Sequence, residues 1–323
     1  MPTAGVIQGL DGAKRLVVSG GWSDAAAAAV EMQAFDRLEF HGGDYDDFDF
    51  LVPYASKIVS LAVPSGRWKG AGGLSRLIAL RRLALGSPLK GVDFTSIEGL
   101  RSLSIEGWSA AYGKSLFECG WLETLHIEGF TDTDCRRIGR LSALESISLA
   151  RGALETLTGL RECTSLRALQ LAYLRKLVDV SDVGSMHTLR EIELVEALSK
   201  VEDVRAITAC EHLRRLDLRG VRISFDDASW LTRMTRLNVL GLSNVASPDW
   251  NSLFASRELK KIAIAFSKPP GLSVDDVRAA AIERGLQPTA VKTLGVPHKP
   301  IGFVVEFRPE GSTANLWFWR DVP

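Results

Sequence analysis

The sequence predicts an α/β solenoid, a fold in which short structural repeats stack side by side. Between Leu100 and Leu194 one six-residue pattern, apolar at its first, fourth and sixth places, occurs five times, with starts 22, 22, 22 and 23 residues apart. A fixed period of this length is the signature of a repeat architecture. The segments between copies also carry apolar residues three apart, as at Leu157, Leu160 and Cys163. One repeat cannot bury these apolar residues alone, whereas stacked neighbours can.

The pattern extends beyond this stretch in both directions. It has twelve copies, 20 to 24 residues apart, which begin at Ala13, Phe35, Ile58, Leu80, Leu100, Leu122, Leu144, Leu166, Leu189, Leu213, Leu237 and Leu259. Alternate residues of an extended strand point to the same side, so the fourth and sixth places of each copy are expected to enter the core. The third, fifth and seventh places are expected to face solvent. We therefore predict about 12 parallel strands.

Copies such as Leu122-x-x-Leu125-x-Ile127 and Leu166-x-x-Leu169-x-Leu171 resemble the repeat of leucine-rich repeat proteins. The resemblance covers about residues 13–267. It implies a right-handed curved solenoid with a parallel sheet on the concave face and turns, 3₁₀ segments or helices on the convex face. It also implies a role as a recognition module or an inhibitor.

The chain departs from the family pattern at one place in every repeat. The family repeat carries Asn three residues after the last strand Leu, where the amide bonds the backbone of the turn. Here this place holds mostly apolar residues, which are Trp108, Phe130, Gly152, Leu174, Ala197, Val221 and Val245. We expect an apolar ladder there, with the hydrogen bonds of the turn left to the backbone or to water. Glycine in the preceding place, as at Gly129, fits a bend in the chain.

The segments on either side of the repeats are expected to differ from them. Residues 1–34 are predicted to form an N-terminal cap or degenerate first repeat, with a helix over Ala25–Met32 that Ser23 caps. Residues 35–267 hold the repeats, and residues 268–323 form a C-terminal αββ unit.

The αββ unit has a predicted helix from Ser273 to about Arg284, which ends at Gly285. Its two strands are predicted over Gly302–Phe307 and Asn315–Trp319. The last repeat of a solenoid exposes an apolar edge, so one interpretation is a cap that covers this edge. The other is a small independent module.

Composition and cysteine usage limit the class of protein. Lys plus Arg equals Asp plus Glu, at 39 each, so the formal charge is zero and the basic excess of a nucleic-acid or membrane-surface binder is missing. We expect neither a signal peptide nor a membrane span. Cys119, Cys163 and Cys210 each lie three residues before a copy of the pattern, where other repeats carry Leu or Met. Buried, reduced thiols are predicted there, and they favour a cytoplasmic location.

The sequence offers little catalytic chemistry. Its histidines and cysteines show no metal-ligand spacing, and no nucleophile motif is present, so we predict no cofactor, no metal, no catalytic residues and no enzymatic activity. Asp44, Asp46, Asp47 and Asp49 form an acidic cluster, which is either a solvated loop or a Ca²⁺ site. An alternative hypothesis is an effector or enzyme with activity in the αββ unit and substrate selection by the repeats.

The concave face is the predicted working surface. Many of its residues are small, such as Ser104, Ser148 and Ala168. They either let a partner approach the sheet or relieve crowding on a curved face. Trp108 and Phe130 are expected to be buried in the ladder, because they occupy the place of the Asn.

Large and charged residues stand out against the small ones, and aromatic residues near charges are typical of binding hot spots. The candidate protein-binding residues are Trp68, Glu106, Tyr112, His126, Glu128, Tyr173, Glu191, Glu193, Arg215, Asp217, Arg219 and Lys261. Among them Trp68, Tyr112 and Tyr173 are expected to be exposed. We therefore predict a scaffold that recognises a protein partner, in its narrowest form an inhibitor or immunity-type protein.

Overall fold

The computed structural model describes residues 3–8, 12–33, 35–196, 204–219, 228–246, 249–267, 271–296 and 299–307. The chain forms two compact units. Unit 1 comprises Met1–Arg190 and Leu194–Cys210, and unit 2 comprises Glu191–Glu193 and Glu211–Pro323.

Each of the twelve copies of the sequence pattern contains a strand of one large sheet. These strands are β2 (Lys14–Ser19), β3 (Arg37–His41), β5 (Ser60–Val63), β7 (Arg82–Leu85), β8 (Ser102–Ile105), β9 (Thr124–Glu128), β10 (Ser146–Ala150), β11 (Ala168–Ala172), β12 (Glu191–Val195), β13 (Arg215–Arg219), β14 (Val239–Val245) and β15 (Lys261–Phe266). From β2 to β11, and again from β13 to β15, neighbouring copies pair in parallel, so that Leu103 lies beside Leu125 and Leu125 beside Ile147. The predicted parallel strands are confirmed.

Over the described residues the sheet has 15 strands, because three antiparallel strands at its ends join the twelve parallel ones. In unit 1, β1 (Thr3–Gln8) pairs with β2 in antiparallel orientation. In unit 2, β17 (Lys299–Phe307) pairs antiparallel with β15, and β16 (Pro288–Val296) pairs antiparallel with β17. Unit 1 also has a separate two-stranded sheet of β4 (Asp44–Tyr45) and β6 (Arg67–Trp68).

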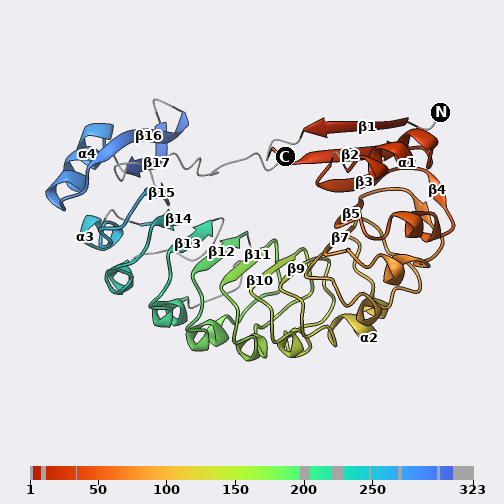
Figure 1. The fold of residues 1–323 in the computed structure, drawn as a ribbon. Helices are drawn as coiled ribbons and strands as arrows, with labels where there is room; N and C mark the ends of the chain where they lie inside the picture. Colours follow the sequence, from red (N-terminus) through yellow and green to blue (C-terminus); the bar gives the residue numbers. More distant parts are fainter. Residues whose placement is uncertain are drawn as a thin grey trace. The chain divides into compact units, whose positions relative to one another are not determined.

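The segments between the strands are short and mostly 3₁₀-helical. The α-helices among them are α1 (Asp24–Glu31), α2 (Gly113–Leu116) and α3 (Trp250–Leu253), and the 3₁₀ segments are Asp49–Tyr54, Leu74–Arg76, Phe94–Ser96, Ala110–Tyr112, Ile138–Arg140, Leu160–Glu162, Ser181–Ser185, Arg205–Ala209 and Ser229–Arg233. Within unit 1 the strands lie on the inner side of an arc and these segments on its outer side (Figure 1). Ser23 caps α1 as predicted, since its Oγ accepts the N–H of Ala26 at 3.3 Å.

The predicted core positions are buried. Leu103, Ile105 and Leu125 are each 0–1 % exposed, whereas Ser102 and Ser104, which alternate with the apolar residues of β8, keep contact with solvent. All four cysteines are free and buried, which confirms the core thiols. The apolar ladder is confirmed as well, because Phe130, Leu174 and Val245 are buried.

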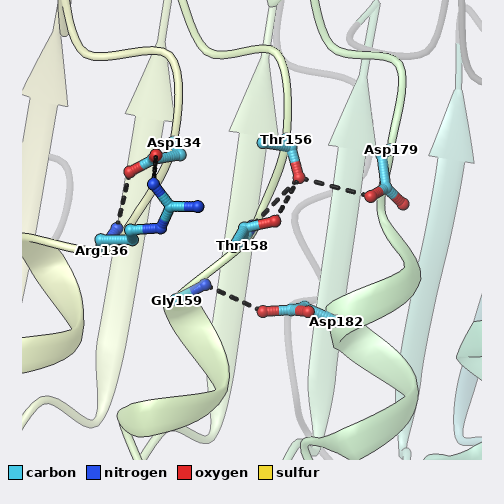
Figure 2. A network of polar contacts seen from close by, with 7 residues as sticks. All are labelled: Asp134, Arg136, Thr156, Thr158, Gly159, Asp179 and Asp182. Carbon is cyan, nitrogen blue, oxygen red and sulfur yellow. Dashed lines mark hydrogen bonds and ion pairs between the residues drawn. The ribbon is translucent and has the colours of Figure 1, made fainter.

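A column of short polar side chains shapes the turns that lead into the 3₁₀ segments. In unit 1 each member accepts a hydrogen bond from the backbone N–H two residues later, and the members are Asp47 (2.8 Å), Asp93 (3.0 Å), Asp134 (3.0 Å), Thr156 (3.1 Å) and Asp179 (2.8 Å). In unit 2, Asp249 accepts the N–H of Asn251 at 3.2 Å in the same way and caps α3. Figure 2 shows this column in three neighbouring repeats. Short Asp and Thr side chains form such turns readily.

Contacts between repeats reinforce the same column. Asp182 Oδ2 accepts the N–H of Gly159 at 3.0 Å, and Thr156 Oγ1 lies 3.4 Å from Asp179 Oδ2 (Figure 2). Gly159 has φ +98°, and a Cβ there would lie 2.5 Å from the Cα of Arg136. This position therefore requires glycine, both for its left-handed backbone and for the close approach of the neighbouring repeat.

The C-terminal elements continue the sheet of unit 2. Helix α4 (Val274–Glu283) begins at Ser273, as predicted, with a capping box in which Ser273 and Asp276 exchange hydrogen bonds. The predicted strand Gly302–Phe307 lies within β17, whereas β16 was not predicted. On β17, Phe303 packs against Phe266 of β15. The predicted strand over residues 315–319 lies outside the described residues.

Candidate functional site

The concave face, which is the solvent-facing side of the parallel sheet, is lined with small residues over β8 to β11 in unit 1. In the register of the sheet Ser104 lies beside His126, and His126 lies beside Ser148. The ring of His126 is half-buried, with Nδ1 2.9 Å from Ser148 Oγ. The remaining small residues of this strip are Ser102, Ser146, Ala150, Ala168 and Ala172, and all are half-buried. Small side chains cover most of this strip, with the larger His126 and Gln170 among them, and they let another chain approach the strands.

Three side chains in contact with one another border this strip. Arg151 Nη1 donates to Glu128 Oε1 at 2.6 Å, and Arg151 Cζ lies 5.5 Å from the centre of the Tyr173 ring. The three side chains come from three successive repeats, at the ends of β9, β10 and β11. The Arg151 side chain is exposed, and those of Glu128 and Tyr173 are partly exposed. They present an acid, a base and an aromatic ring within a small area.

The backbone at this border is left-handed. Gly129, Arg151, Tyr173 and Glu196 hold the same place in successive repeats of unit 1, with φ values of +81°, +51°, +56° and +49°. Asn244 holds that place in unit 2, with φ +62°. A left-handed conformation costs a residue other than glycine roughly 1–2 kcal/mol. Glycine at position 129 avoids this cost, whereas its neighbours do not.

Hydrogen bonds between backbones hold these turns in place of the missing Asn side chains. The N–H of Gly129 donates to the carbonyl of Ala150 at 2.7 Å, and the N–H of Arg151 donates to that of Ala172 at 3.0 Å. Tyr173 donates to Val195 in the same way at 2.9 Å. Each turn is therefore satisfied by the end of the next strand.

A second charged cluster lies on the sheet of unit 2. Arg219 Nε donates to Asp217 Oδ1 at 2.7 Å, and Arg219 Nη2 donates to Glu193 Oε1 at 2.9 Å. Asp217 is fully buried, and a Cβ at Gly241 would lie 2.6 Å from its Oδ1. Burial raises the pKa of Asp217, and the positive charge of Arg219 only partly opposes this. The carboxylate of Asp217 therefore fixes the Arg219 guanidinium and does not meet solvent itself.

The aromatic residues expected at an exposed rim differ in burial, and one of them belongs to the interior. Tyr112 is 2 % exposed, and its hydroxyl oxygen accepts the N–H of Leu89. Trp68 is half-buried, with its ring stacked on Phe48 at 4.1 Å and on Tyr45 at 4.3 Å between ring centres. The expectation of exposure was wrong for Tyr112, because its ring is packed in the core, whereas Trp68 keeps partial exposure. Tyr173 keeps partial exposure.

The other predicted site residues divide by burial. Glu106 and Glu191 are exposed, and Glu193, Arg215 and Arg219 are half-buried. Lys261 is buried, contrary to the expectation of a solvent-facing basic end, and its Nζ lies 3.5 Å from Glu306 Oε1 on β17. The expectation that Asp217 faces solvent was also wrong, because its side chain is fully buried.

Sequence reasoning missed Arg151, although the sequence carries a signal for it. Its place in the repeat is Gly107, Gly129 and Gly220 elsewhere, so a large residue there departs from the pattern. Trp108, which was expected to be buried in the ladder, is only half-buried, and its Nε1 donates to Thr131 Oγ1 at 3.1 Å.

The acidic cluster at Asp44–Asp49 is engaged with basic residues of the next repeat. Asp46 Oδ1 lies 2.6 Å from Lys69 Nζ, Asp44 Oδ1 lies 3.9 Å from Arg67 Nε, and Asp49 pairs with Arg76. Within the ranges that the structure describes, no group of three or more His, Cys, Asp or Glu residues is arranged to hold a metal ion. The cluster acts as a set of ion pairs between repeats.

The buried thiols are poor nucleophiles. Burial raises the pKa of Cys119 and of Cys210 to about 11 and that of Cys163 to about 12, and it raises the pKa of Cys135 as well. The thiolate is the reactive form of cysteine, so these groups are held in their inert state at neutral pH.

No helix in the described part of the chain combines the length and apolar character needed to cross a membrane.

Comparison with known proteins supports the fold alone. No protein-family model matches the sequence, and no curated protein matches it. Among solved structures, an internalin (InlF) from Listeria monocytogenes is similar with a TM-score of 0.55 and 19 % identity over 83 % of this chain and 84 % of that chain.

Two further solved structures are more distant. Internalin C2 from Listeria monocytogenes has a TM-score of 0.38 and 19 % identity over 58 % of this chain and 71 % of that chain. The plant peptide hormone receptor RGFR1, solved in complex with RGF2, has a TM-score of 0.38 and 14 % identity over 82 % of this chain and 56 % of that chain.

The fold is therefore assigned from three observations. The sequence pattern recurs twelve times, its copies form parallel strands in register, and the fold is similar to that of internalin InlF. Together they show that this chain folds as a leucine-rich repeat protein.

Proposed function

We propose that the chain is a protein-binding scaffold that recognises a protein partner through the concave face of unit 1. The observation that carries this proposal is the backbone at Arg151 and Tyr173, where large side chains occupy left-handed positions beside the strip of small residues. Glycine would satisfy the same turn at no cost, as Gly129 does one repeat earlier. Strain of this kind persists where the rest of the structure holds it, and it clusters at functional sites.

The chemistry of this border suits a protein surface. Tyr and Arg, together with Trp, are the residues enriched among binding hot spots, and here Arg151 contacts both Tyr173 and the acidic Glu128. The small-residue strip spans four adjacent strands, which is roughly 14 Å across at the usual strand spacing. A small ligand would need a concave pocket to bury most of its surface, whereas a shallow strip with a charged and aromatic border accommodates a folded partner or an extended segment.

Inhibition of the bound partner, as in an immunity-type protein, is a narrower form of this function, and it rests on the same surface. The four buried thiols, with their raised pKa values, offer no nucleophile for a catalytic role. A cytoplasmic location also stays a prediction, and these reduced thiols support it.

A pull-down from the source cell tests the proposal. The wild-type chain and the double variant Arg151→Gly with Tyr173→Gly are immobilised in parallel, and retained proteins are compared by quantitative mass spectrometry. A control variant, Arg161→Gly, removes an exposed arginine from a 3₁₀ segment on the outer side of unit 1.

We expect at least one protein to bind the wild type and the control variant but to lose about tenfold in affinity, or 1.4 kcal/mol, for the double variant. Calorimetric titration with the purified partner measures this loss. A partner that binds the double variant as tightly as the wild type would show that the border of Glu128, Arg151 and Tyr173 is not the binding surface.

A further inference from the structure

We propose that the outer edge of β1 is a self-association surface, at which a second copy of this chain adds its own β1 in antiparallel orientation. β1 is the terminal strand in the order of the sheet and is the outermost strand of unit 1 (Figure 1). One of its edges pairs with β2. Among the residues that the structure describes, no strand pairs with the other edge. Alternate residues therefore direct their N–H and C=O groups outward, where a further strand can bind them.

The side chains of β1 are exposed on both faces of the sheet. Val6 lies beside Leu16, a core residue that is fully buried, yet Val6 itself is 47 % exposed. Ile7 lies beside Arg15 on the opposite face and is 53 % exposed. Within the described residues the apolar layer of unit 1 thus ends at β1, where α1 packs nearby but leaves both side chains about half exposed. A strand added at this edge would continue the layer and remove part of both side chains from water.

Nothing in the sequence of β1 protects its edge. The strand reads Thr-Ala-Gly-Val-Ile-Gln, without charge or proline. The terminal strand of unit 2 differs in each respect, because β16 contains Pro288 and the exposed Lys292, and its pairing with β17 has two register shifts. Proline, lysine and bulges are the devices by which proteins blunt edge strands. One terminal strand of this chain is therefore blunted against pairing, and the other is open to it.

A second copy of the chain is the occupant that fits this edge. Antiparallel pairing of two identical strands about a two-fold axis uses the same surface on both copies, so each edge satisfies the other. Like charges directly opposite one another would oppose such pairing, and β1 carries none. The whole chain has a formal charge of zero, so electrostatic repulsion between copies is small. The interface is short, with six residues from each copy, so we expect a dimer that dissociates on dilution.

Sedimentation velocity over a range of protein concentrations tests the proposal. We expect the wild type to shift from monomer to dimer as its concentration rises. The variants Val6→Lys and Ile7→Lys place a charge at the centre of the strand and bring like charges together in the dimer, so each should weaken association by about tenfold. The matched controls Val59→Lys and Ile78→Lys change exposed apolar residues away from β1 and should associate as the wild type does.

Cross-linking provides a second readout that does not depend on a destabilising change. The four native thiols are buried, so a cysteine introduced at Gly5, Val6 or Ile7 is the reactive thiol of the folded chain. A short thiol cross-linker should join two copies through these positions and should not join copies that carry Ile78→Cys. A wild type that stays monomeric at every concentration would overturn the proposal. A dimer that the two lysine variants on β1 leave intact would overturn it as well.

Discussion

The hydroxyl oxygen of Tyr112 accepts a hydrogen bond from the backbone N–H of Leu89, one repeat earlier in the chain. Both residues are buried, and the ring of Tyr112 packs against Phe94 and Trp108, with ring centres 5.5 and 6.1 Å away. A side chain from one repeat thus satisfies the backbone of its neighbour inside the core. Interfaces of this kind, and not the single repeat, stabilise a solenoid.

Removal of the Tyr112 hydroxyl should therefore destabilise the fold. In Tyr112→Phe the ring stays in place, but the buried N–H of Leu89 loses its acceptor, which costs about 1–3 kcal/mol. Urea unfolding followed by circular dichroism measures this loss. Tyr173→Phe is the matched control, because its half-exposed ring lies at the border of the concave face and should change the free energy of unfolding little. Equal stability of the two variants would contradict the structural role of Tyr112.

The left-handed backbone at Tyr173 predicts that a Gly variant is more stable than an Ala variant at this position, which is the reverse of the usual order. Ala is normally more stable than Gly in a regular element, but at φ +56° only Gly is free of strain. We expect Tyr173→Gly to be more stable than Tyr173→Ala by about 1 kcal/mol in thermal or urea unfolding. Ala168→Gly, in strand β11, should show the usual order and destabilise the chain by roughly 0.5–1 kcal/mol. A Tyr173→Ala variant more stable than Tyr173→Gly would contradict a left-handed backbone at this position.

The cysteines should be inert in the folded chain. With a pKa raised to about 11, Cys119 and Cys210 hold only about one thiolate in a thousand molecules at pH 8. We expect alkylation by iodoacetamide to be far slower than for free cysteine, and to become complete once the chain is unfolded in guanidinium. Mass spectrometry after timed quenching counts the labelled sites. Rapid labelling of any of the four thiols under native conditions would show that its side chain is accessible.

Asp217 predicts a dependence of stability on pH. Its pKa is raised by burial, so the folded chain keeps the proton to a higher pH than the unfolded chain does. The stabilisation from this proton is fully present below the ordinary aspartate pKa of about 3.9, and it is lost as the pH rises through the raised value. The positive charges of Arg219 and Arg215 lower the pKa of Asp217 and the negative charge of Glu193 raises it, but burial has the largest effect.

Asp217→Asn removes this titration and leaves an oxygen to accept from Arg219. We expect the free energy of unfolding of the Asn variant, relative to wild type, to improve as the pH rises above about 4. Urea titrations at a series of pH values measure the difference. Glu191→Gln, at an exposed carboxylate, is the control and should show a flat difference. A difference for Asp217→Asn that falls with rising pH would mean that Arg219 stabilises the carboxylate more than burial opposes it.

Several features of this chain could be predicted from sequence because they depend on one repeat at a time. The apolar places that became Leu103 and Ile105 in β8 follow from the alternation of an extended strand. The cap of α4 at Ser273 follows from a local hydrogen bond, and the buried place of Cys163 follows from its position in the period. None of these needs knowledge of a neighbour beyond the fact that repeats stack.

Other features depended on what the neighbouring repeats contribute. The sequence treats Tyr112 and Tyr173 alike, yet Leu89 and Phe94 contact the first, which is buried, and Arg151 lies over the second, which is partly exposed. The strands β1 and β17 do not contain the repeat pattern. Their antiparallel pairing with the ends of the sheet was therefore not predicted.

The sequence by itself determined the period, the register of the twelve strands and the side of the sheet that faces solvent. The tertiary structure decided which aromatic residues are buried, that large side chains at Arg151 and Tyr173 occupy left-handed turns, and that β1 leaves an open edge. The physical reason is that periodicity is a property of the single repeat, whereas burial and strain arise only where side chains and backbones of different repeats meet.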